Sequence, residues 1–151
     1  MCGVFGQYSD HRIEHRHNIK LIEKLIFHRG PDAFSSKLFD KFSFGAFSRL
    51  SINDLTENSD QPMSSKCGNF HLMFNGEIYN YKELRKTLIY KGWCFKSTGD
   101  TEVLLAGLII YGTKFINKLD GIFAFSFYDL KQETLILCRD RMGIKPLYYS
   151  T

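Results

Sequence analysis

The sequence has no apolar stretch approaching the roughly 18 residues that a membrane-spanning helix needs. Its first ten residues, MCGVFGQYSD, also lack the basic segment and the sustained apolar segment of a secretory signal peptide. Both absences argue against membrane insertion and export. We therefore expect a soluble, cytoplasmic protein that contacts no membrane.

Cysteine is scarce, and its spacing excludes the usual zinc-binding modules. The four cysteines are Cys2, Cys67, Cys94 and Cys138. They form no CxxC pair and show none of the close spacings of zinc ligands. We expect reduced thiols and no bound metal, with Cys94 and Cys138 as small core residues in apolar, strand-like runs.

Histidine offers one alternative metal site. His11 and His15 have the i, i+4 spacing of two ligands on one helix face, and His17 follows them. No cysteine or carboxylate cluster accompanies these histidines, so a solvated basic segment is the favoured interpretation.

The sequence also lacks a concentration of basic charge. Lys and Arg number 20 against 16 Asp and Glu, and the basic residues are dispersed along the chain. Nucleic-acid-binding domains usually gather them into a stripe with interleaved, exposed aromatic rings. We therefore interpret the aromatic runs at 42–47 and 123–128 as core, and a nucleic-acid-binding domain is a disfavoured alternative.

No internal repeat, low-complexity segment or linker divides the chain. Its 151 residues, 44% of them hydrophobic and 15% aromatic, suffice for one well-filled core but not comfortably for two. Residues 1–151 are therefore expected to form a single domain.

Hydrophobic periodicity predicts the elements of the N-terminal half. Residues 2–8 suit a buried strand that begins at the chain terminus, and residues 18–28 have a broad apolar helical face that ends at HRGPD. Residues 42–46 and 70–74 alternate as strands do. A polar loop, roughly 53–69, separates them, and Asn75-Gly76 favours a tight turn after the second.

The C-terminal half predicts two helices and a hairpin. Asn80 and Glu83 have capping-box spacing at the start of one helix that stops near Gly92. A second helix is expected over 101–111, with Asp100 as its N-cap and Gly112 beyond its end. Residues 122–128 are apolar on both faces, as in a strand between two layers, and 135–138 suit its hairpin partner. The element order is α+β, without β-α-β alternation.

Cys2 carries a specific chemical possibility because removal of Met1 would expose its own α-amine. That amine has an ordinary pKa of about 7.7 to 8.0, so it can accept the thiol proton without a histidine partner. One residue would then supply both nucleophile and base. Taken alone, however, a cysteine at this position is usually incidental.

Other residues suit an acyl-transfer site by type. A developing oxyanion needs donors, which Asn75-Gly76 could supply from a side-chain amide and a backbone N–H, although a plain hairpin turn is the alternative. A free amino acid needs an arginine for its carboxylate and carboxylates for its ammonium. Arg49, Glu77 and Asp100 are candidates, each of which would otherwise be a surface charge or a helix cap.

Six motifs that follow one another along the chain strengthen the case that these residues have a catalytic or binding role. They are MCGVFG (1–6), HRGPD (28–32), RLSI (49–52), NGEIYNY (75–81), TGDTE (98–102) and RDRMGIKPLYY (139–149). Together they resemble the N-terminal class II glutamine amidotransferase, or glutaminase, domain of the glutamine-hydrolysing asparagine synthetase family. The resemblance implies an α+β fold, the four-layer αββα sandwich of two antiparallel sheets found in N-terminal-nucleophile hydrolases.

The resemblance also implies a role for each matched residue. Cys2 would attack the side-chain amide of L-glutamine and form a thioester, releasing ammonia for an ATP-dependent amidation of the asparagine-synthetase type. Asn75 and Gly76 would form the oxyanion hole. The remaining substrate contacts would come from Arg49, Leu50, Ser51, Ile52 and Asn53 at the carboxylate, and from Glu77 and Asp100 at the ammonium.

The resemblance gives no chemical role to the HRGPD motif or to Phe47. The HRGPD loop is expected to shape the pocket, but it supplies no chemical step. Phe47 departs from the family pattern, because many relatives have histidine two residues before the arginine.

The pyrophosphate-binding loop SGGxD of the family's synthetase domain is absent from the sequence. We therefore expect ATP and Mg²⁺ to bind only in that missing domain, and no cofactor in this chain. The chain is expected to be truncated at its C-terminal end and to work with a synthetase domain or subunit; a homodimer is also compatible with the sequence. The ammonia acceptor is not readable, and a non-catalytic remnant that packs against a synthetase is the alternative function.

Overall fold

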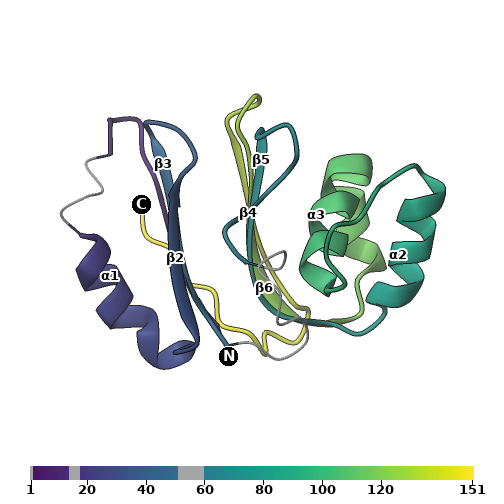
Figure 1. Ribbon diagram of the computed structural model, residues 1–151, viewed down its shortest axis with the longest axis horizontal. Coiled ribbons are helices and arrows are strands. Elements are labelled where there is room, and N and C mark those ends of the chain that lie inside the picture. The colour runs from purple at the N-terminus through teal and green to yellow at the C-terminus, as the bar shows by residue number, and fades with distance from the viewer. Residues whose placement is uncertain (1, 14–17, 51–59) are drawn as a thin grey trace.

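The computed structural model describes residues 2–13, 18–50 and 60–151, and within them two sheets lie face to face with helices on both outer sides (Figure 1). In chain order the elements are β1 (Gly3–Tyr8), α1 (Ile19–Ile26), the 3-10 helix η2 (Phe27–Arg29), β2 (Ala33–Leu38), β3 (Ser43–Arg49), β4 (Met63–Ser64), β5 (Phe70–Ile78), α2 (Tyr81–Tyr90), α3 (Asp100–Tyr111), the 3-10 helix η4 (Gly112–Lys118), β6 (Gly121–Asp129) and β7 (Thr134–Arg139).

The first sheet has three antiparallel strands in the order β1-β3-β2. Its central strand, β3, is buried from Ser43 to Ser48 because a neighbouring layer covers each face. On the outer face Ile22 of α1 packs against Phe44 and Ala46. The predicted helix and strand are thus confirmed, but the first strand is an edge strand whose Gly6 and Gln7 are exposed, so the expectation that it is buried throughout is wrong.

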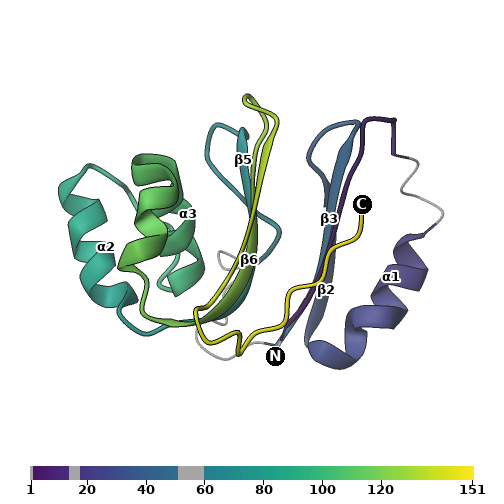
Figure 2. The same cartoon turned by 180° about the vertical axis from the view of Figure 1, so that it is seen from behind.

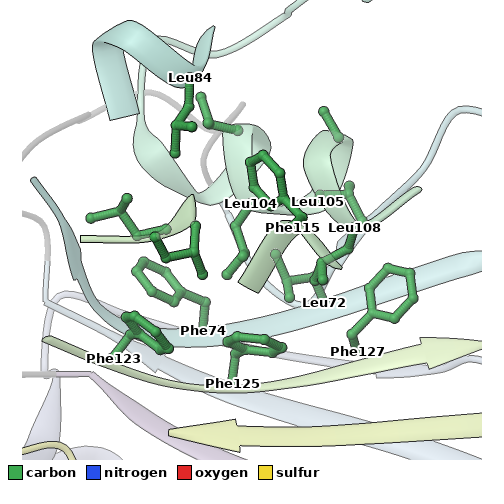
Figure 3. Packing of buried hydrophobic residues seen from close by; sticks show 14 of the residues in the cluster. Leu72, Phe74, Leu84, Leu104, Leu105, Leu108, Phe115, Phe123, Phe125 and Phe127 are labelled. Carbon is green, nitrogen blue, oxygen red and sulfur yellow. The ribbon is translucent and has the colours of Figure 1, made fainter. Parts of the chain in front are cut away.

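The second sheet has four antiparallel strands in the order β4-β5-β6-β7. The predicted doubly apolar strand is β6, and its hairpin partner is β7, as expected. Figure 3 shows the core between this sheet and the helices, formed by side chains that include Leu72, Phe74, Leu104, Leu105, Phe115 and Phe125. Helix α3 lies between the sheet and α2, which explains why it is apolar all round (Figure 2).

The layers therefore follow the order α1, first sheet, second sheet, and α2 with α3. This is the αββα sandwich expected from the sequence. Within the described ranges, no helix is long and apolar enough to cross a membrane.

The predicted turn at Asn75-Gly76 is wrong. Strand β5 runs through both residues to Ile78, in unbroken register with β6. Glycine is required at position 76 for another reason: a Cβ there would collide with the carbonyl oxygen of Ile122, and the φ of Gly76 is 157°. Close approach of two strands, and not a hairpin, explains the dipeptide.

At the two predicted helix caps, tertiary partners bind the side chains. Asn80 is the N-cap residue of α2, as predicted, but it makes no capping hydrogen bond: its side chain donates to the Lys118 carbonyl oxygen at 2.8 Å and accepts from the Asp120 N–H at 3.1 Å. Asp100 is the first residue of α3 and not its N-cap, which is Gly99. The predicted stops at Gly92 and Gly112 are confirmed by positive φ angles of 90° and 61°.

The two cysteines that were predicted to lie in the core differ in burial. Cys138 is half-buried in β7, whereas Cys94 is exposed and lies outside any strand, so its assignment to the core is wrong. The side chain of His11 is 89% exposed, and His15 and His17 lie outside the described residues.

Candidate functional site

The Cys2 thiol lies where the first sheet begins. Cys2 immediately precedes β1, and Gly3 pairs with Ser48 near the end of β3. This pairing brings the thiol to Leu50: its Sγ lies 3.7 Å from the Leu50 carbonyl oxygen and 3.4 Å from the Leu50 nitrogen, which donates to it. These two contacts hold the sulfur at the end of β3, and Cys2 as a residue is only partly buried.

A cavity of about 940 Å³ separates the two sheets at this point. Cys2 enters it from the first sheet and Asn75 from the second. His28 and Arg29 also line it, as does the segment 146–151. The predicted nucleophile and the predicted oxyanion donor therefore face one cavity although they are 73 positions apart in the sequence.

Alternation along β5 determines which residues face the cavity. Met73 and Asn75 line it, whereas Leu72 and Phe74 belong to the core beneath the helices. Glu77 follows Asn75 by two residues in the strand, so its side chain lies on the same face, and it is exposed. Asn75 itself is buried, with 8% of its surface exposed.

Side chains from other segments hydrogen-bond to the backbone of β5 along the edge that faces away from β6. The side-chain amide of Gln61 bonds to both the N–H and the carbonyl of Phe74, and the carboxylate of Asp100 accepts the Ile78 N–H at 2.9 Å. In an antiparallel strand every second residue addresses the same neighbour. Gly76 lies between Phe74 and Ile78 in this series, so its N–H points to that edge, close to the Asn75 side chain.

Arg49 ends β3, and its side chain is 12% exposed. It forms an ion pair with Asp60, whose side chain is 47% exposed. Since Asp60 is followed by Gln61, which bonds to Phe74, residues 60–61 join the end of β3 to β5.

Asp100 and Glu77 place two acidic groups near the end of β5. Burial raises the pKa of Asp100 above its usual value, and the charge of Glu77 acts in the same direction, while the Ile78 amide opposes both. A cation bound beside these carboxylates would relieve their repulsion and the cost of burying Asp100.

The HRGPD loop is fastened to the end of β3. The Ser48 hydroxyl donates to the Gly30 carbonyl oxygen at 2.6 Å, and the Asp32 N–H donates to the Arg49 carbonyl oxygen at 3.0 Å. A Cβ on Gly30 would collide with the Ser48 carbonyl oxygen. The loop therefore packs against the strand that carries Arg49 and, one residue later, Leu50.

The structure thus separates the predicted site residues into groups. Cys2 and Asn75 share the cavity, and Arg49 and Leu50 adjoin Cys2 at the end of β3. A third group, made of Gly76, Glu77 and Asp100, gathers at the end of β5 and does not line the cavity. The predicted substrate contacts of Ser51, Ile52 and Asn53 fall outside the described residues.

Sequence reasoning did not identify Asp60 or Gln61. Both fall in the segment predicted as a polar loop, where periodicity carries no information about long-range partners. The only local signal was their position just before Pro62 and the short strand β4.

Comparison with known proteins agrees with the motifs. A family model described as "Glutamine amidotransferase domain" matches residues 1–151. The Bacillus subtilis protein "Asparagine synthetase [glutamine-hydrolyzing] 1" is 43% identical over 155 residues, covering 100% of this chain and 24% of that protein. The Penicillium rubens protein "Amidase chyE" is 38% identical over 163 residues, covering 99% of this chain and 24% of that protein. The chain spans about a quarter of the length of these curated relatives.

A solved structure supports the fold. The glutamine phosphoribosylpyrophosphate amidotransferase of B. subtilis superposes with a TM-score of 0.74, covering 96% of this chain and 38% of that one. At 21% identity this likeness concerns the fold alone. The expected αββα sandwich of two antiparallel sheets and the resemblance to the glutamine amidotransferase domain family are both confirmed.

Proposed function

This chain belongs to the glutamine amidotransferase domain family, and we propose that it hydrolyses L-glutamine to glutamate and ammonia through a thioester on Cys2. The observation that carries the proposal is the shared cavity, which Cys2 and Asn75 line from opposite sheets. A nucleophile and a hydrogen-bond donor on either side of one space suit attack on a carbonyl carbon.

In the proposed first step, the freed α-amine of Cys2 takes the proton of its own thiol, and the sulfur attacks the side-chain carbonyl carbon of glutamine. The tetrahedral intermediate carries negative charge on its oxygen. Its collapse breaks the C–N bond, and the ammonium of Cys2 returns the proton so that ammonia leaves. Water then attacks the thioester with the same amine as base, which releases glutamate and the free thiol.

The side chain of Asn75 and the N–H of Gly76 are proposed to donate to the oxyanion. The regular pairing of β5 with β6 holds the backbone of both residues, so little reorganisation is needed when charge develops. The Asn75 side chain comes from the cavity face of the strand and the Gly76 N–H from its edge. Since Gly76 does not itself line the cavity, the oxygen that both donors bind would lie at its rim, beside this edge of β5.

Charged side chains at the end of β3 and at the end of β5 match the two charges of a free amino acid by type. Arg49 is proposed to bind the substrate carboxylate together with Leu50, Ser51, Ile52 and Asn53. Arg49 ends β3 beside Cys2, and a planar guanidinium matches the geometry of a carboxylate. Glu77 and Asp100 are proposed to bind the substrate ammonium, which their closeness to each other supports.

The ammonia is proposed to serve an ATP-dependent amidation in a synthetase domain or subunit. The support is that the asparagine synthetase named above carries the matching region as about a quarter of its length. The family resemblance implies a carboxylate such as aspartate as the acceptor, whereas a sugar-acid or peptide-like acceptor would leave the same domain. ATP and aspartate added to residues 1–151 alone should therefore change neither the rate nor the products of glutamine hydrolysis.

Product analysis with a Cys2 variant tests the proposed function. Incubation with glutamine should yield glutamate and ammonia in equal amounts, and acid quenching should trap a glutamyl adduct on the peptide that contains Cys2. The Cys2→Ala variant should form neither product nor adduct, because the nucleophile is lost, whereas Cys94→Ala at an exposed position should behave as the wild type. Undiminished turnover by Cys2→Ala would refute the thioester route.

A further inference from the structure

We propose that Gln61 is a positioning residue for this reaction, because its side-chain amide completes the β4–β5 ladder opposite Phe74 and so fixes the backbone that carries Asn75 and Gly76. The inference rests on the proposed function for its catalytic consequence.

The register of β4 and β5 identifies the position that Gln61 occupies. Met63 pairs with Leu72, and the Ser65 N–H donates to the Phe70 carbonyl oxygen at 2.9 Å. In this antiparallel register the next hydrogen-bonded position sets residue 61 opposite residue 74. At that position the ladder continues through a side chain in place of the backbone.

The Gln61 side chain supplies both bonds of a ladder pair. Its Oε1 accepts the Phe74 N–H at 2.6 Å, and its Nε2 donates to the Phe74 carbonyl oxygen at 3.0 Å. Gln61 is 6% exposed, so water does not readily replace either bond. The two bonds hold the peptide planes on both sides of Phe74, and the second of these planes contains the nitrogen of Asn75.

The backbone around Gln61 is anchored to the other sheet. Its carbonyl oxygen accepts the hydroxyl proton of Ser35 in β2, and Asp60 pairs with Arg49 at the end of β3. Strand β3 in turn pairs with β1, which follows Cys2 directly. Gln61 therefore links the strand that carries the oxyanion donors to the sheet that carries the nucleophile.

Only a primary amide of this length satisfies both groups of Phe74 in this way. Methionine has a similar shape but offers neither donor nor acceptor, and glutamate at neutral pH offers no donor and adds a buried charge. Either replacement leaves a buried backbone group of Phe74 unsatisfied, which costs more than the lost hydrogen bond itself. The strand is then expected to shift or to admit water just before Asn75.

Kinetics separate positioning from a merely structural role. Gln61→Met should lower kcat by roughly 10- to 100-fold while KM changes less than about threefold, because misaligned donors affect the transition state most. The kcat is taken per competent site, counted by titrating Cys2 with a diazoketone analogue of glutamine. Gln132→Met, in the exposed turn between β6 and β7, is the matched control and should change neither parameter.

Amide exchange provides a readout that needs no turnover. In the wild type the Phe74 N–H should exchange slowly, and in Gln61→Met it should exchange roughly tenfold faster or more, with shifted signals for the Asn75 and Gly76 amides. Gln61→Glu should also shift the Gly76 signal, and it serves as the second variant if Gln61→Met does not fold.

Three outcomes overturn or uphold the inference. A lower kcat per titrated site together with altered Phe74 exchange upholds it. A lower melting temperature with unchanged kcat per titrated site and unchanged Gly76 signals overturns it. If the wild type itself hydrolyses no glutamine, the proposed function fails, and the exchange of the Phe74 amide alone then decides whether Gln61 fixes the strand.

Discussion

The side chain of Asn75 lies at the boundary between structure and chemistry. It projects from a strand whose backbone is fully paired with β6, and it faces the same cavity as Cys2. A donor in this position contributes most when the oxyanion forms and little when glutamine binds. The kinetic constants of its variant can therefore reveal which role it has.

We expect Asn75→Ala to lower kcat by roughly 100-fold or more with a small change in KM, as loss of one oxyanion donor does. Arg49→Ala should behave differently: it should mainly raise KM, because the substrate carboxylate loses its partner before and during the reaction. Steady-state kinetics on both variants provide the comparison. If Asn75→Ala changed only KM, the oxyanion assignment would be wrong.

His71 gives this domain a specific acid sensitivity. Burial lowers its pKa from 6.5 to about 4; the charge of Lys37 acts in the same direction, and Asp40 acts against it. The Nδ1 atom bonds to the Ser64 hydroxyl at 2.9 Å, and Lys37 donates to the same hydroxyl at 2.7 Å. The ring stacks on Phe39, with centroids 4.3 Å apart, so the neutral imidazole is the form that the fold accommodates.

The sign of the effect follows from proton counting. Between pH 6.5 and about 4 the unfolded chain binds a proton at His71 that the folded chain does not, so stability is lost as the pH falls through this window. Between about pH 7 and about pH 4.5, His71 should lower the free energy of unfolding by about 2 kcal/mol. Urea unfolding of His71→Gln should lack this component, whereas His11→Gln at an exposed position should retain it. An identical pH dependence in His71→Gln would contradict the assignment.

At the scale of elements, the approach of β5 to β6 depends on glycine. A Cβ on Gly76 would collide with the Ile122 carbonyl oxygen, so the two strands must separate to accept any side chain. Gly68 has a φ of 74°, but a Cβ on it would meet no atom within 4 Å, so a substitution there meets only backbone strain. Comparing alanine substitutions at the two glycines therefore separates the energetic cost of the collision with β6 from the cost of a positive φ angle.

Gly76→Ala should lower the free energy of unfolding by about 2–4 kcal/mol, since backbone atoms of β6 have to move. Gly68→Ala should cost only about 1 kcal/mol. Urea unfolding of both variants would measure the difference. Equal costs would show that β6 yields easily, and the proposed rigidity of the oxyanion strand would then lack support.

Elements with a clear period were predictable from the sequence, and those that depend on distant partners were not. The strands around residues 42–46, 70–74 and 122–128 and both long helices of the C-terminal half were confirmed. The Asn75-Gly76 turn failed because the local preference of the dipeptide is overridden by pairing with β6. The capping bond of Asn80 and the N-cap position of Asp100 failed for a similar reason, since residues far along the chain bind those side chains.

At the scale of the whole molecule, the layer order came from the family resemblance and not from periodicity. Alternation indicates that a strand has two faces, but it does not state which sheet lies opposite. The resemblance supplied the residues of the site, and the structure adds how they meet: Cys2 and Asn75 come from facing sheets. It also adds Gln61, whose long-range bonds no local pattern could indicate.

The position of Cys2 makes the start of the chain the most informative place to test the account. If the α-amine of Cys2 is the base, any residue before Cys2 converts that amine into an amide and removes its basicity. The thiol itself would remain beside Leu50 in both forms. Structure and nucleophile are thus preserved while one function is removed.

The decisive measurement compares glutamate release by two preparations of the same chain, one beginning at Cys2 and one retaining Met1, each verified by mass spectrometry. Alkylation of Cys2 in both serves as the control for an accessible thiol. We predict that the preparation beginning at Cys2 hydrolyses glutamine and that the one retaining Met1 is slower by roughly 100-fold or more. Equal turnover by fully Met1-retaining protein would contradict the N-terminal nucleophile mechanism.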